Sequence, residues 1–230
     1  MLTPEGYGAG RPARVKGDLV GADSRVYDAI FEDILAQRLP PGTRLVESAI
    51  GLRLGVPRAV VRMGLLRLAH DRIVERVPNR GCAVARPGPD EARHLFEARR
   101  LLEGGLAAAL AGQLGARALA ALSRLIARGQ AAFEAGDSAG WLRAAADFHN
   151  RLAALAGNPV LESMVRELVT RSMLISALSL EPGRTRYVSG LRAELLAALA
   201  QGDARGRQRA RRLMEKLLTE IESGIEPRAG

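Results

Sequence analysis

Apolar residues recur at helical spacing along most of the chain, and one stretch near the N-terminus combines short helices with strands. The spacing predicts an amphipathic helix from Arg25 to Gln37. Apolar positions then mark two shorter helical segments, between Arg44 and Leu54 and after Pro57, with Gly55 between them. Two short amphipathic helices joined by a turn that contains glycine are typical of a helix-turn-helix.

A hairpin is predicted directly after the second short helix. The β-branched run Ile73–Val77 and the run Cys82–Ala85 flank a turn at Pro78–Gly81. This order predicts a winged helix-turn-helix over residues 21–86, in which the hairpin is the wing. Residues 1–20 contain Gly, Pro, Arg and Lys without periodicity, so we expect a flexible arm there.

Helical periodicity returns after Arg86–Pro89, a segment rich in residues that continue neither a strand nor a helix. We place a domain boundary there and predict an all-α bundle over residues 89–225. The expected helices are Pro89–Ala111, Ala116–Ala135, Ser138–Ala156, Pro159–Leu180, Tyr187–Ala200 and Asp203–Ser223. Breaks are expected at Gly112, Gly136, Gly157, Gly183 and Gly202. The fold class is therefore mainly α, with an N-terminal winged helix-turn-helix.

The charge distribution favours DNA as the partner of the N-terminal part. The chain has 34 basic and 25 acidic residues, a net charge of +9, which favours a polyanionic partner. Between Arg53 and Arg86 there are eight arginines and two acids, a balance of 8 − 2 = +6. Arg58 and Arg62 share one helix face, from which arginine can pair with guanine in the major groove. The alternative is a solvated basic face on an ordinary helix.

Other functional classes find little support in the sequence. A single cysteine, Cys82, excludes an internal disulfide framework and fits a reducing cytoplasm. No apolar run could span a membrane, and the N-terminus lacks the apolar core of a signal peptide, so we expect a cytoplasmic protein. His70, His94 and His149 lie in unrelated contexts without a nucleophile–base pattern, so we expect no enzyme.

The N-terminal part resembles the GntR family of bacterial transcription regulators. The matching residues are Tyr27–Ile30, Leu39–Leu45, Leu54–Arg58, Val61–Arg62, Leu65, Arg67–Leu68 and Asn79–Gly81. The resemblance implies operator contacts by the recognition helix and the wing tip. The residues we assign to DNA binding are Arg44, Ser48, Arg58, Ala59, Arg62, Asn79, Arg80 and Gly81. Pro57, Ala59 and Ser48 depart from the residues common in the family, which leaves the operator sequence open.

The C-terminal part resembles the FCD domain, the helical effector-binding domain of the FadR branch of that family. The matching residues are Leu95–Arg99, Leu102–Glu103, Asp147–His149, Ala156–Leu161, Ala200–Asp203 and Leu213–Met214. The resemblance implies a bundle that dimerises and binds a small carboxylate or related metabolite. It further implies a regulator, most often a repressor, that reads a pseudo-palindromic operator as a homodimer.

Many FCD domains hold a divalent metal with one aspartate and three histidines, and this set is largely missing here. His149 matches the first histidine, but Ala145 stands at the position of the aspartate. Arg192 and Leu217 stand at the positions of the other two histidines. One imidazole without a carboxylate is too few ligands for a divalent metal, so we expect no metal and no other cofactor.

Without a metal, the predicted effector site depends on Arg99, His149 and Arg192, whose guanidinium groups can hold an anion. The alternative is that Arg99 pairs with Glu103, Arg192 points to solvent and His149 is a hydrogen-bonded core residue. A second functional class also stays open: a DNA-binding helical protein with no small-molecule effector, which acts as an architectural protein or under the control of a protein partner.

Overall fold

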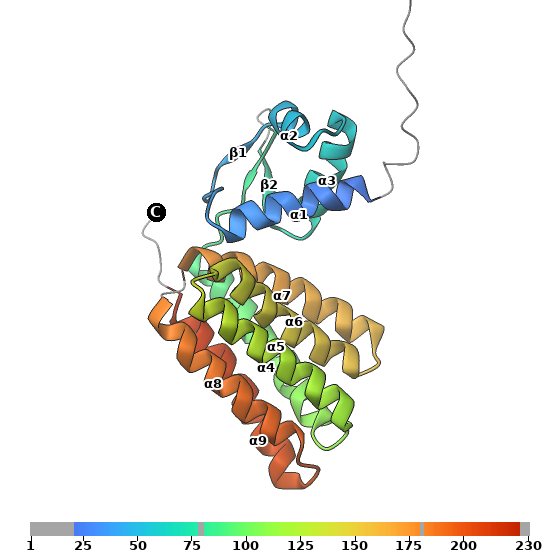
Figure 1. The fold of residues 1–230 in the computed structure, drawn as a ribbon, viewed down its shortest axis with the longest axis vertical. Coiled ribbons are helices and arrows are strands. Elements are labelled where there is room, and N and C mark those ends of the chain that lie inside the picture. The colour runs from blue at the N-terminus through green and yellow to red at the C-terminus, as the bar shows by residue number, and fades with distance from the viewer. Residues whose placement is uncertain (1–20, 78–80, 180–181, 226–230) are drawn as a thin grey trace, which may run out of the picture.

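A computed structural model describes residues 21–77, 81–179 and 182–225 of the 230-residue chain. It shows a small unit of helices and strands at one end of a larger helical bundle (Figure 1). The predicted arm over residues 1–20 and the turn residues Pro78, Asn79 and Arg80 lie outside the described residues.

The N-terminal unit consists of three helices and a three-stranded sheet. The helices are α1 (Ala22–Leu35), α2 (Glu47–Leu54) and α3 (Arg58–His70), and the strands are β1 (Arg44–Leu45), β2 (Val74–Val77) and β3 (Gly81–Val84). The sheet has the order β1-β3-β2 and is antiparallel, with Glu75 opposite Ala83 in the wing. The third strand, β1, was not predicted. It has only two residues, too few for an alternating pattern, and forms because the chain turns at Gly42 (φ 78°).

Close packing of α1 on α3 holds the N-terminal unit together. A Cβ atom at Gly64 would lie 2.6 Å from Cγ1 of Val26, so glycine is required for this approach. Val26, Val61 and Leu68 are fully buried in the same core. Between α2 and α3, Gly55 adopts φ 65° and ends α2, which gives the turn of the predicted helix-turn-helix.

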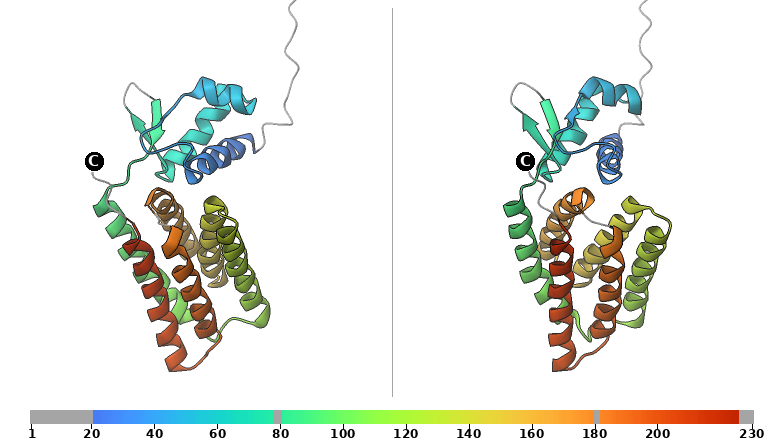
Figure 2. Two further views of the ribbon diagram at one scale, coloured as in Figure 1. Left: turned by 60° about the vertical axis from the view of Figure 1, so that its left-hand side comes forward. Right: turned by 90° about the vertical axis from the view of Figure 1, so that its left-hand side faces the viewer.

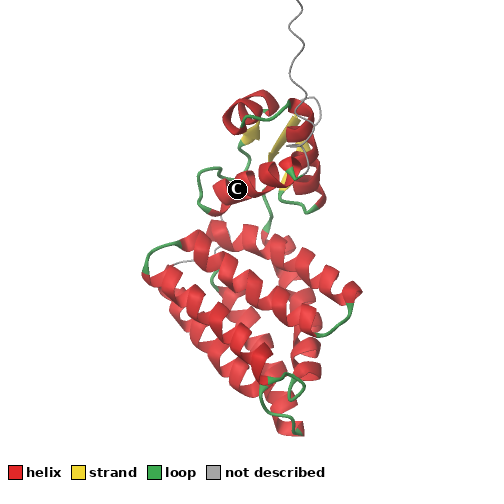
Figure 3. Cartoon of the chain, turned by 45° about the vertical axis from the view of Figure 1, so that its right-hand side comes forward, coloured by secondary structure: helices red, strands yellow, loops and turns green. Residues whose placement is uncertain are grey.

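The bundle is formed by long helices that lie side by side (Figures 2 and 3). They are α4 (Pro89–Leu110), α5 (Ala116–Glu134), α6 (Ser138–Leu155), α7 (Pro159–Ser179), α8 (Pro182–Leu199) and α9 (Ala204–Ser223). The closest pairs are α4 with α9, α5 with α6, α6 with α7 and α8 with α9. Apolar faces of all six helices meet in one core, and none of the described helices is long and apolar enough to cross a membrane.

Two helix boundaries differ from the prediction. Helix α8 begins at Pro182 instead of Tyr187, and Gly183, predicted as a break, lies inside it. Proline is well suited to a first helical position because its missing N–H would have no partner there. Helix α1 spans Ala22 to Leu35 instead of Arg25 to Gln37, because Gln37 adopts the left-handed φ of 57°.

The end of α1 joins the N-terminal unit to the bundle. Gln37 Nε2 donates a hydrogen bond to the backbone oxygen of Ala177 on α7, at 2.5 Å. Glu32 on α1 forms an ion pair with Arg143 on α6. Leu174 of α7 is buried in the core of the N-terminal unit. The helix that supports α3 is thus in direct contact with the bundle.

Candidate DNA-binding surface and effector site

Helix α2 lies on the side of the N-terminal unit away from the bundle, and α1 lies on the side toward it (Figure 1). Arg58 and Ala59 are exposed in the first turn of α3, and Arg62 follows one turn later. Ser48 is exposed in the first turn of α2, and Arg44 is exposed on β1. These five predicted residues are available to a large partner.

Arg62 is already paired within this surface. Its Nε and Nη2 atoms each lie 3.1 Å from a carboxylate oxygen of Glu47, at the start of α2. The hydrogen bond from Arg62 lowers the pKa of Glu47. Because solvent screens both side chains, the pair contributes little to the stability of the fold. It orients the guanidinium of Arg62 next to the exposed Arg58.

The predicted wing tip is described only at one end. Gly81 begins β3 with φ 85°, in the left-handed region that favours glycine, and is exposed. Asn79 and Arg80, the other two residues assigned to the tip, lie outside the described residues.

A buried polar cluster lies in the middle of the bundle and includes the three predicted effector residues. Arg99 and Glu103 come from α4, His149 from α6, Ser172 from α7 and Arg192 from α8. Arg99 donates from Nε to Glu103 at 2.6 Å and from Nη1 to Ser172 Oγ at 2.7 Å. The other Glu103 oxygen lies 2.5 Å from His149 Nδ1. Arg192 is 4% exposed.

These positions agree with two parts of the alternative interpretation of the cluster and contradict the third. The pair of Arg99 with Glu103 is present, as that alternative expected, and His149 is hydrogen-bonded in the core. Its third part is wrong, because Arg192 is buried and lines the same small cavity as Arg99 and His149. Ser172 was not anticipated, since a serine within an apolar helix gives no signal of a partner on another helix.

Burial and charge set the protonation of the cluster. Burial would raise the pKa of Glu103, but the charge of Arg99, with hydrogen bonds from Arg99 and His149, lowers it to about 2. Burial lowers the pKa of His149 to about 4, so the imidazole is neutral near pH 7. Burial and the nearby Arg99 lower the pKa of Arg192 to about 10, so it stays charged. Two guanidinium groups therefore face one carboxylate among these described side chains.

The cavity beside the cluster is small and has unused hydrogen-bonding groups. Its volume is about 30 Å³, enough for about two water molecules. Arg99 Nη2, His149 Nε2 and Arg192 Nε are buried and have no hydrogen-bond partner among the described residues. Unpaired buried polar atoms cost free energy. A ligand with acceptor atoms can recover it at the two arginine N–H groups, whereas His149 Nε2, which is unprotonated in a neutral ring that donates from Nδ1, needs a donor.

The cluster does not fit the metal site implied by the family resemblance. Ala145 lines the cavity where an aspartate would stand, and Leu217 is fully buried in the apolar core. Asp147 is at the surface, paired with Arg128. Within the described parts of the chain, no three His, Cys, Asp or Glu side chains are placed to hold a metal ion. The positive charges of the two arginines would also repel a cation.

A larger cavity of about 570 Å³ lies between the N-terminal unit and the bundle. Leu35, Ala36 and Gln37 line one side of it, next to the hydrogen bond that joins α1 to α7. The residues that it shares with the small cavity are Trp141, Leu142 and Ser176. These three side chains therefore border both spaces.

Comparison with known proteins gives consistent matches over both parts. Residues 22–84 match the gntR family of bacterial regulatory proteins, and residues 94–220 match the FCD domain. An HTH-type transcriptional regulator from the TAR-I ttuE-ttuC' intergenic region of Agrobacterium vitis is 32% identical over 146 residues, 61% of this chain and 85% of that protein.

Two solved structures share the fold. A GntR transcriptional regulator from Rhodococcus sp. RHA1 has a TM-score of 0.76 at 24% identity, over 88% of this chain and 96% of that one. McbR/YncC of E. coli has a TM-score of 0.73 at 23% identity, over 86% of this chain and 93% of that one.

Proposed function

Because the chain belongs to the GntR family of bacterial regulatory proteins and carries an FCD domain, we propose that it is a repressor released by a small acidic metabolite. It reads a short pseudo-palindromic operator as a homodimer, in the cytoplasm. The observation that carries the acidic ligand is the buried cluster, in which, among the described side chains, Arg99 and Arg192 face one carboxylate, that of Glu103. A ligand carboxylate would balance the second guanidinium.

Exposed apolar side chains support a homodimer. On the bundle the large exposed ones are Leu101 of α4 and Val160 and Met164 of α7. Helices α4 and α7 pack against each other, with Glu91 paired to Arg171. A symmetric interface with a second copy would cover these side chains, and a two-fold protein matches a two-fold operator.

The ligand must enlarge the small cavity, and this links binding to the N-terminal unit. A metabolite does not fit into about 30 Å³. Movement of Trp141, Leu142 or Ser176 would open it toward the larger cavity, whose wall includes Gln37. A ligand that prefers the open arrangement would weaken the contact of α1 with α7 and change the spacing of the DNA-binding units.

A second candidate is a DNA-binding regulator without a small-molecule effector. The small volume of the cavity and the pairing of Glu103 with both Arg99 and His149 favour it, since the carboxylate of the cluster already has two partners. A screen of mono- and dicarboxylic acids by thermal shift separates the two: the first candidate requires at least one acid that stabilises the protein.

The proposal predicts that Arg192→Ala abolishes the response to the acid found in that screen. Arg192 is buried beside the cavity, and its Nε has no hydrogen-bond partner among the described residues, so its loss removes the favourable partner of the ligand. We expect at least a tenfold loss of affinity by calorimetry, for one charged hydrogen bond of roughly 1.5–3 kcal/mol. Arg151→Ala, an exposed arginine on α6, is the control and should bind as the original protein does. Equal binding by Arg192→Ala would place the ligand elsewhere.

Chelators are expected to change nothing. With Ala145 and Leu217 at two of the positions implied for ligands, treatment with EDTA should shift neither the melting temperature nor operator affinity. Metal analysis of the purified protein should find no stoichiometric zinc, nickel or manganese. A melting temperature that falls with EDTA and recovers with one of these metals would contradict the metal-free site.

A further inference from the structure

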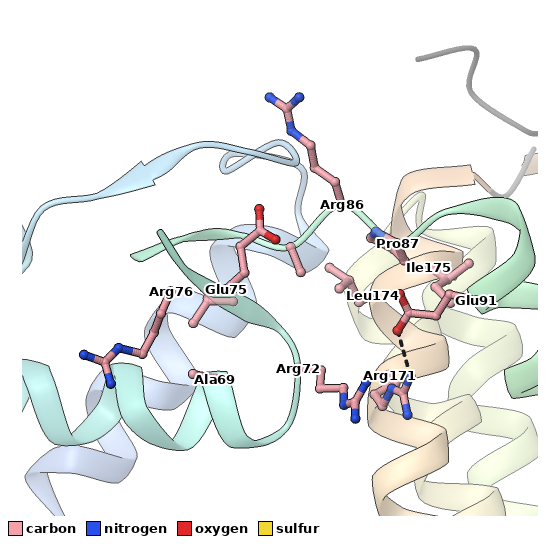
Figure 4. Close-up of a pocket in the computed structure, with 12 residues that line it drawn as sticks. Ala69, Arg72, Glu75, Arg76, Arg86, Pro87, Glu91, Arg171, Leu174 and Ile175 are labelled. Carbon is pink, nitrogen blue, oxygen red and sulfur yellow. Dashed lines mark hydrogen bonds and ion pairs between the residues drawn. The ribbon is translucent and has the colours of Figure 1, made fainter. Parts of the chain in front are cut away.

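A separate pocket of about 440 Å³ lies where the wing and the end of α3 meet α4 and α7 (Figure 4). We call it the interdomain pocket. Its charged lining residues are Arg72, Arg76, Arg86, Arg171, Glu75 and Glu91, a balance of 4 − 2 = +2. Apolar residues, among them Leu174 and Ile175, form another part of the lining. It shares no lining residue with the buried cluster around His149.

Two of the arginines approach each other from opposite sides of this pocket. Figure 4 shows the side chains of Arg72, after α3, and Arg171, on α7, directed toward one another, whereas Arg76 and Arg86 point away. Two like charges in one pocket repel each other, and an anion between them would remove that repulsion.

Arg171 keeps hydrogen-bonding capacity for such an anion. Its Nη2 lies 2.7 Å from Glu91 Oε1, and its Nη1 lies 3.9 Å from Glu167. Its Nε is buried and has no partner among the described residues. The side chain is 16% exposed, so the cost of the unpaired N–H is only partly relieved by solvent.

Arg72 occupies an unusual backbone conformation that directs it here. Its φ is 57°, in the left-handed region that residues other than glycine rarely adopt. The N–H of Arg72 bonds to the oxygen of Ala69 and the N–H of Ile73 to the oxygen of Leu68, so the turn is fixed by the end of α3. The side chain thus extends from a defined turn and not from a loose loop.

The position of the pocket separates it from the DNA-binding surface. Helix α3 has 13 residues and is therefore about 20 Å long. Arg58 and Arg62 lie in its first half, whereas Arg72 follows its last turn and faces the bundle. An operator on the first turn of α3 would leave the pocket accessible to small molecules.

We infer that the interdomain pocket binds a small organic oxyanion, a phosphorylated or polycarboxylate compound, whose acidic group lies between Arg72 and Arg171 and whose apolar part contacts Leu174 and Ile175. Because one arginine belongs to each part of the chain, the bound anion holds the N-terminal unit in one position on the bundle. This site is independent of the effector proposed for the buried cluster.

Inorganic pyrophosphate is the first probe, measured by calorimetry on the full-length protein in chloride buffer of matched ionic strength. The binding of phosphate and of citrate is measured in parallel. Tighter binding of phosphate indicates a phosphorylated compound, and tighter binding of citrate indicates a polycarboxylate. We expect pyrophosphate to bind, and Arg72→Gly and Arg171→Gln each to weaken it roughly tenfold or more. Glycine suits the φ of Arg72, so that variant keeps the turn. Arg171→Gln would leave the Glu91 carboxylate without its partner, so the double variant with Glu91→Gln is measured as well.

Two control variants make the result specific. Arg166→Gln removes an arginine of α7 that pairs with Glu162 outside the pocket, and Arg151→Ala removes an exposed arginine of α6; both should bind pyrophosphate normally. The inference is overturned if none of the three anions binds, or if Arg166→Gln weakens binding as much as Arg171→Gln. Displacement of pyrophosphate by non-operator duplex DNA would also overturn it, because the arginines would then be contacts to DNA phosphates.

Discussion

Replacing Glu103 by alanine should destabilise the protein by about 3–5 kcal/mol, the range for breaking a buried ion pair on one side. Glu103 is fully buried and accepts hydrogen bonds from Arg99 and His149, so the variant leaves a buried guanidinium without its counter-ion and creates a cavity. Urea unfolding at fixed protein concentration measures the loss. Glu97→Ala, at an exposed position on the same helix, should change stability by less than about 0.5 kcal/mol.

The pH dependence of stability gives a second test of the buried contacts of Glu103. The folded pKa of Glu103 is about 2, below its ordinary value of 4.5, so its stabilisation is complete above pH 4.5 and is lost as pH falls toward 2. The folded pKa of His149, about 4, lies below 6.5, so protonation of the unfolded chain lowers stability between pH 6.5 and 4. Glu103→Ala should flatten the loss below pH 4.5. An unchanged profile, or a loss no larger than that of Glu97→Ala, would contradict the buried pair.

The helix-turn-helix was predictable because its signals are local. Gly55 ends α2 where its sequence position predicted a break, and α3 begins directly after Pro57. The strand β1 was missed because it depends on pairing with β3, nearly 40 residues later in the chain, which a two-residue segment does not reveal. The start of α8 was missed because Gly183 was read as a break, although glycine is tolerated beside a proline that begins a helix.

The effector cluster was only partly predictable for a similar reason. Arg99 and Glu103 are one helical turn apart, so their pairing could be expected from the sequence. The burial of Arg192 and the bond from Arg99 to Ser172 depend on how α4, α7 and α8 pack together. The contact of Gln37 with Ala177 joins residues 140 positions apart, and nothing local to either residue indicates it.

The other large expected effect concerns operator recognition by α3. Arg58→Ala or Arg62→Ala should lower the preference for operator over random DNA by roughly 10- to 100-fold, since an arginine pair with guanine gives about 1–3 kcal/mol of discrimination. Both side chains are exposed. The operator is first obtained by selection from random duplexes. Affinity for operator and for random DNA is then titrated at several salt concentrations.

Comparison of further variants separates contacts to the bases from electrostatic attraction to DNA of any sequence. Glu47→Ala frees Arg62 from its partner at 3.1 Å, and we expect this to raise affinity for random DNA while specificity falls, because the guanidinium is no longer oriented. Arg80→Ala at the predicted wing should weaken binding to all sequences alike and reduce the salt dependence. Arg151→Ala on the bundle is the control for net charge. If Arg58→Ala and Arg62→Ala both keep full operator preference, α3 is not the recognition helix, and the base contacts must come from α2, β1 or the wing.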